Sequence, residues 1–177
     1  MEIVCLGDSN VKRHQDLLHF GILSKCEFIL TYNFNELKEN IIGLGKTDVI
    51  IIHVLTNDSK YICHDQSWKS DYEKKDDLIS LAHNFVNMIK QLIVENPDVK
   101  IIISMILPRF DKKDEINMYF NGNKIINFEI SKCLLEVKNV ILIKNCDMEE
   151  TDFVDKFHLS GKSFEELRNK WITAIGK

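Results

Sequence analysis

Short apolar runs recur along the chain, separated by longer stretches of mixed polarity. The runs are rich in β-branched residues and predict five β-strands, over residues 3–6, 27–30, 49–54, 100–105 and 140–143. The third run is apolar nearly throughout, which is typical of a parallel strand that is covered on both faces.

The stretches between these runs favour helices. The clearest helix is residues 78–94, in which six apolar residues repeat at helical spacing, Leu78, Leu81, Phe85, Met88, Ile89 and Leu92. Further helices are predicted over residues 11–20, 35–42 (with Asn33 or Asn35 as the N-cap), 118–137 and 160–175 (with Ser160 as the N-cap). Polar segments 61–77, 109–117 and 145–159 are expected to be surface loops.

Strands that alternate with helices predict an α/β fold, a three-layer α/β/α sandwich around a parallel sheet. A length of 177 residues suits one domain, so we expect a single domain over residues 1–177. Sheets of this kind bind ligands outside the carboxyl ends of their strands.

Composition narrows the classes of function. Apolar residues make up 45% and charged residues 28%, which is ordinary for a soluble globular protein. The net charge of −4 argues against direct binding to nucleic acid. Five widely spaced cysteines without a Cys-x-x-Cys motif predict a reducing, intracellular (cytoplasmic) location. No apolar stretch reaches the length of a membrane span, and we expect no signal peptide.

Residues that suit acyl-transfer chemistry follow three of the predicted strands. Ser9 comes after the first strand, Asn57 after the third, and the pair Asp155 and His158 after the fifth. A serine hydroxyl becomes a useful nucleophile when a base takes its proton and a third group orients that base. Because the carboxyl ends of parallel strands share one edge of a sheet, we expect these residues to converge.

Each of these residues also has a purely structural interpretation. Ser9 could cap the following helix, although Asp8 could be that cap instead. Asn57 could end a strand in a turn, and Asp58 suits a role in holding a loop through backbone hydrogen bonds. The Asp-x-x-His spacing equally fits a local turn around a solvated His158. The ordered set favours catalysis over these alternatives.

The motifs together resemble the SGNH (GDSL-type) hydrolases. The resemblance rests on three blocks in order, Gly7-Asp8-Ser9, Asn57-Asp58 and Asp155-x-x-His158. It implies a flavodoxin-like sandwich with a five-stranded parallel sheet. More narrowly, the residues around Ser9 and the strand before Asn57 are similar to the esterase domains of non-LTR retrotransposon proteins.

This resemblance implies a metal-independent carboxylic ester hydrolase that works through an acyl-serine and needs no cofactor. Ser9 would be the nucleophile, His158 the general base, and Asp155 the group that orients it. The backbone N–H of Ser9 and the side chain of Asn57 would form the oxyanion hole. The partner would be a small-molecule acyl ester, such as an acetyl or a lipid-like ester. The motifs set neither the acyl group nor the oligomeric state.

Two departures from the family pattern weaken the implied activity. Leu55 stands where the family usually has a glycine two residues before the asparagine, and residues 30–34 lack the family's oxyanion glycine. Losing one oxyanion donor costs on the order of a hundredfold in rate. A catalytically weak domain used for binding or assembly is therefore an alternative, and acyl transfer to another acceptor is a further one.

Two histidines outside these motifs have structural interpretations. His53 lies inside an apolar run and suits the core. His64 lies beside Cys63 and Asp65, but nothing nearby completes four ligands, so we predict no metal site.

Overall fold

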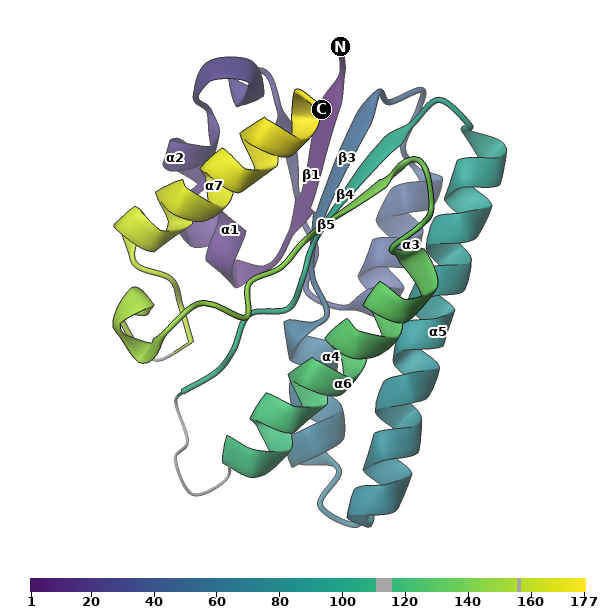
Figure 1. Cartoon of the computed structure of the whole chain (residues 1–177), viewed down its shortest axis with the longest axis vertical. Coiled ribbons are helices and arrows are strands. Elements are labelled where there is room, and N and C mark those ends of the chain that lie inside the picture. Colours follow the sequence, from purple (N-terminus) through teal and green to yellow (C-terminus); the bar gives the residue numbers. More distant parts are fainter. Residues whose placement is uncertain (111–115, 156) are drawn as a thin grey trace.

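A five-stranded parallel sheet forms the centre of the molecule (Figure 1), in a computed structural model that describes residues 1–110, 116–155 and 157–177. The strands are β1 (Ile3–Gly7), β2 (Glu27–Leu30), β3 (Val49–His53), β4 (Lys100–Ser104) and β5 (Val140–Ile143). Their order across the sheet is β2-β1-β3-β4-β5, and every neighbouring pair is parallel. The predicted strands and the three-layer α/β fold are confirmed.

Helices cover both faces of this sheet, as Figure 1 shows. One face carries α3 (Phe34–Ile42), α4 (Thr56–Lys60), α5 (Asp71–Glu95) and α6 (Ile116–Leu134), and the other carries α1 (Ser9–Arg13), α2 (Gln15–Leu18) and α7 (Gly161–Ile175). Alternate residues of each strand point to opposite faces, so the apolar strands supply two cores. Phe85 is buried in the first core, and Phe164 and Trp171 are buried in the second.

The prediction of a surface loop over residues 61–77 is wrong, because most of that segment is helical. A π-helical turn (Tyr61–Asp65) continues α4, and α5 begins at Asp71. Ser70 and Glu73 form a reciprocal capping box that starts α5. The charges that suggested a loop lie mainly on exposed positions of the first turns of α5. Charged residues on the outward face of a helix are as well solvated as in a loop.

The helix predicted over residues 11–20 begins earlier and is interrupted. It starts at Ser9, ends at Arg13, and resumes as α2 after His14, whose backbone (φ −116°, ψ 25°) is not helical. In the predicted loop 145–159 a short 3-10 turn covers Glu150–Asp152. The predicted caps Asn33 and Ser160 are confirmed. Residues 111–115, within the predicted loop 109–117, lie outside the described residues.

None of the helices in the described part of the chain combines enough length with enough apolar character to cross a lipid bilayer.

Candidate active site

Ser9 is the first residue of α1, directly beyond the end of β1. Asp8, which is buried, caps this helix because its Oδ1 accepts the N–H of Asn10 at 2.9 Å. The capping role therefore belongs to Asp8, and the half-buried Ser9 hydroxyl is not used for it. An α-helix that begins at a nucleophile also presents unpaired N–H groups and the positive end of its dipole there.

Asp155 and His158 form a hydrogen-bonded pair after β5. Asp155 Oδ2 lies 2.8 Å from His158 Nδ1, and Asp155 Oδ1 accepts the backbone N–H of His158 at 2.8 Å. A carboxylate can only accept, so Nδ1 carries the proton and Nε2 keeps its lone pair. This tautomer is the one that a general base requires.

The pKa of Asp155 follows from these contacts. Partial burial raises it, but the hydrogen bonds from the ring and the backbone N–H of His158 outweigh burial and lower the pKa from 3.8 to about 2. Arg13 Nη1 also lies 3.3 Å from Asp155 Oδ2. The Asp155 carboxylate is thus ionised at every pH at which an imidazole is neutral and can act as a base.

The side chain of Phe157 packs on the His158 ring and is itself covered by a cationic side chain. Phe157 packs against it with ring centroids 4.0 Å apart, and the Arg109 guanidinium lies 4.9 Å from the centre of the Phe157 ring. The His158 side chain keeps 18% of its surface exposed. The ring is therefore held in place and is still open to a ligand.

Asn57 occupies the first turn of α4 and contacts the loop between β2 and α3. Its Nδ2 donates to the carbonyl oxygen of Tyr32 at 2.9 Å, which leaves the second amide hydrogen for another acceptor. Asp58 accepts the N–H of Phe34 with both oxygens, at 3.2 and 3.1 Å. The prediction that Asp58 holds a loop is confirmed.

The structure brings some predicted site residues together directly and others only through their neighbours. Asp155 and His158 are in contact, whereas among the described residues no hydrogen bond joins the Ser9 hydroxyl to the His158 ring. Leu159, the residue after His158, bonds to Asn10, the residue after Ser9. Catalytic hydrogen bonds often form only once a ligand is bound.

No family model and no curated protein matches the sequence. Solved structures match it over nearly its whole length. A GDSL-like lipase from Bacteroides thetaiotaomicron has 13% identity and a TM-score of 0.70, covering 99% of this chain and 87% of that one.

The chain has the SGNH (GDSL-type) hydrolase fold.

Two further structures of similar shape have different activities in their names. A carbohydrate acetylesterase from Sinorhizobium meliloti has 15% identity and a TM-score of 0.62, covering 99% of this chain and 98% of that one. The C-terminal catalytic domain of a peptidoglycan O-acetyltransferase from Streptococcus pneumoniae has 9% identity and a TM-score of 0.69, covering 99% and 92%. At such identities the likeness establishes the fold alone.

Leu55, the first departure from the SGNH pattern, has a strained backbone. Its φ of 80° and ψ of −4° lie in the left-handed region, and it is the one non-glycine residue with positive φ in the described part of the chain. A glycine adopts this conformation without steric cost, which explains the family preference physically. The Leu55 side chain is fully buried, so core packing holds the turn in this conformation.

The second departure concerns the loop between β2 and α3 of this SGNH fold. Its N–H groups are largely occupied, because Thr31 N–H donates to the carbonyl of Gly7 and Tyr32 N–H donates to Glu36 Oε2 at 2.8 Å. Sequence reasoning missed Glu36, although an Asn-x-x-Glu spacing at a helix start suggests reciprocal capping. The negative charge of Glu36, which is bound to this loop, would destabilise an oxyanion formed beside it.

His53 is the buried histidine at the end of β3, as predicted. Its Nδ1 lies 2.9 Å from Ser104 Oγ, whereas its buried Nε2 has no hydrogen-bond partner, so only one of the two ring nitrogens is satisfied. Burial lowers the pKa of His53 and outweighs the nearby charge of Asp8. Among the described residues, no three His, Cys, Asp or Glu side chains gather as metal ligands.

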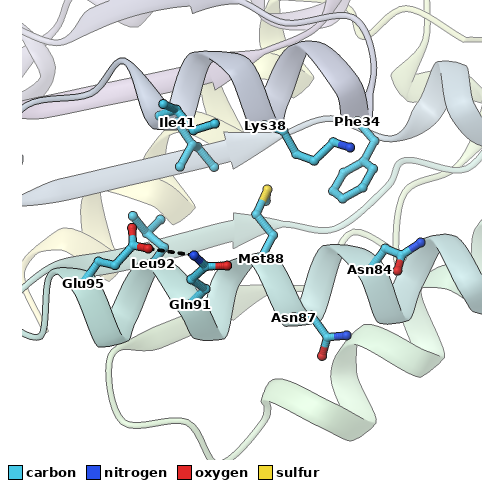
Figure 2. Close-up of a pocket in the computed structure, with 10 residues that line it drawn as sticks. Phe34, Lys38, Ile41, Asn84, Asn87, Met88, Gln91, Leu92 and Glu95 are labelled. Carbon is cyan, nitrogen blue, oxygen red and sulfur yellow. Dashed lines mark hydrogen bonds between the residues drawn. The ribbon is translucent and has the colours of Figure 1, made fainter.

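A surface groove of about 490 Å³ lies between α3 and α5 (Figure 2). Phe34 and Met88 give it an apolar floor, with the ammonium of Lys38 5.0 Å from the centre of the Phe34 ring. None of its lining residues belongs to the predicted catalytic set. The groove is thus separate from the chemistry argued for Ser9.

Proposed function

We propose that this chain is a serine esterase that hydrolyses a small or medium acyl ester, such as an acetyl or a lipid-like ester. The observation that carries the proposal is the Asp155–His158 pair, in a tautomer that keeps Nε2 as a base, on a segment bonded to the helix that begins with Ser9. The esterase and lipase names of proteins with this fold agree with it.

The proposed reaction has two halves. Ser9 Oγ attacks the ester carbonyl while His158 Nε2 takes its proton, and collapse of the tetrahedral intermediate expels the alcohol with that proton. Water then attacks the acyl-serine with the same base, which releases the acid. The Ser9 N–H and the Asn57 amide are the proposed donors to the oxyanion, and Asp155 stabilises the imidazolium.

Ser9→Ala tests this proposal. We expect hydrolysis of p-nitrophenyl acetate to fall by about 10³-fold or more, because the nucleophile is lost, with the unfolding midpoint unchanged. Ser24→Ala, at an exposed serine before β2, is the matched control. Turnover that survives in folded Ser9→Ala rules the mechanism out.

A catalytically weak binding or assembly module is the second candidate. It is favoured by the Glu36 carboxylate on the Tyr32 N–H, in the loop where the family places its oxyanion glycine. A fluorophosphonate probe separates the candidates, since only an activated serine forms the adduct. Folded protein without a Ser9 adduct favours the binding module.

Acyl transfer to an alcohol is a variant of the first candidate, with an acceptor other than water. One protein of the same fold is named as an O-acetyltransferase. Product analysis with added alcohols distinguishes the two, because hydrolysis alone yields only free acid.

A further inference from the structure

Asn10 of α1 and His14, the residue that follows α1, bind the residue after His158 from both sides. Asn10 Oδ1 accepts the N–H of Leu159 at 3.0 Å, and the carbonyl oxygen of Leu159 lies 2.7 Å from His14 Nε2. Both backbone polar groups of Leu159 are thus held by side chains about 150 positions earlier in the sequence. We call this arrangement the Leu159 clamp.

The Asn10 contact of the clamp is buried, and the His14 contact is partly buried. Leu159 and Asn10 are almost inaccessible to solvent, and the His14 ring stacks on Phe164 with centroids 4.9 Å apart. A buried hydrogen bond has no water to replace a lost partner, so the Asn10 contact is the costlier of the two to break. Because a carbonyl oxygen can only accept, His14 carries a proton on Nε2.

We propose that Asn10 and His14 are positioning residues, which fix His158 relative to Ser9 through the backbone of Leu159. The inference rests on the proposed esterase function. Asn10 is adjacent to Ser9, and Leu159 is adjacent to His158, so the clamp links the segment that carries the nucleophile to the segment that carries the base. The Asp155–His158 contacts orient the imidazole only within its own turn, and the ion pair of Asp155 with Arg13 of α1 is exposed to solvent.

Displacement of a base by about 1 Å can cost on the order of a hundredfold in rate. His14→Leu removes the donor, and we expect kcat for p-nitrophenyl acetate to fall by about 10- to 100-fold, with KM changed by less than about threefold, because the clamp does not touch substrate. His14→Gln keeps an N–H donor and should restore most of kcat. Lys12→Gln, an exposed change two residues before His14, is the control.

Spectra of the substrate-free protein test the clamp independently of activity. The ¹⁵N shifts of His14 should report a proton on Nε2. The amide of Leu159 should exchange more slowly than that of Cys146, an exposed residue earlier in the same loop. The ring signals of His158 should shift in His14→Leu and not in Lys12→Gln.

The outcomes separate the two proposals. Wild-type protein that hydrolyses no ester refutes the esterase function, while the spectra still decide whether the clamp exists. An active enzyme with wild-type kcat in folded His14→Leu refutes the positioning role alone. If His14→Leu does not fold, the wild-type spectra and the His14→Gln variant still test the inference. A proton on Nδ1 of His14 or a rapidly exchanging Leu159 amide overturns it. A fall in kcat of about 10-fold or more in folded His14→Gln, which keeps the donor, overturns it as well.

Discussion

Gly7→Ala should displace the helix that carries Ser9. A Cβ at Gly7 would lie 2.6 Å from Cγ2 and 2.7 Å from Cβ of Val11, whereas carbon atoms pack at about 3.5–4.0 Å. Gly7 does not have a positive φ, so the reason for glycine is this close approach. Val11 is fully buried and cannot move aside freely. Overpacking of this kind costs about 1–3 kcal/mol, against an unfolded-state gain of about 0.4–1 kcal/mol.

A double-mutant cycle measures this contact. Val11→Ala alone removes two buried carbons and should cost roughly 2 kcal/mol, at about 0.8 kcal/mol for each carbon plus the cavity term. In the double variant the close contacts with the two γ-carbons of Val11 are gone, while the 2.7 Å approach to Cβ remains. The loss should therefore be smaller than the sum by about 1 kcal/mol and still exceed that of Val11→Ala alone. Urea unfolding gives all three values. Additive losses, or a Gly7→Ala variant as stable as wild type, would refute the reasoning.

Two further predictions concern carboxylates. Asp155→Asn should lower kcat by about 10³–10⁴-fold, because its amide donates to Nδ1 and stabilises the wrong tautomer of His158. The ionised Asp155 of wild type also contributes a small stabilisation, below about 1 kcal/mol for this exposed group. That stabilisation should be present above pH 3.8 and vanish as the pH falls through about 2. A kcat equal to wild type contradicts the assigned role. For Asp58, burial raises the pKa despite the Phe34 N–H, so its contribution to stability is full below pH 3.8 and is lost as the pH rises through the raised value. Wild type should therefore lose stability relative to Asp58→Asn over that range in urea titrations, and a constant difference would show that Asp58 does not titrate there.

The strands and most helices could be predicted because their signals are local. Val49–His53 is apolar at every position but the last, and only a sheet covered on both faces buries such a run. The spacing of Leu78, Phe85 and Leu92 fixed the central part of α5 in the same way. The segment before it was misassigned, because charge on an exposed helical face and charge in a loop look alike in composition.

The residues of the candidate site could likewise be predicted only where their signal is local in the sequence. The Asp-x-x-His spacing, its place after the fifth strand and the family resemblance together pointed to Asp155 and His158. Three residues of separation allow a carboxylate to reach the ring and backbone of one histidine. Asn10 and His14 carried no such signal, because their partner lies about 150 residues away. Nothing local distinguishes a histidine that holds a distant backbone from one on a solvated helix end.

The sequence by itself determined the order of strands and helices, the fold class and the short-range Asp–His pair, because each depends on side chains within a few positions of one another. Only the tertiary structure decided that Leu55 takes a left-handed turn, that Glu36 binds the Tyr32 N–H, and that Asn10 of α1 accepts the N–H of Leu159. The first two depend on how loops close against a buried core. The third depends on bringing the two ends of the chain to one edge of the sheet, where backbone groups lose water and must find protein partners.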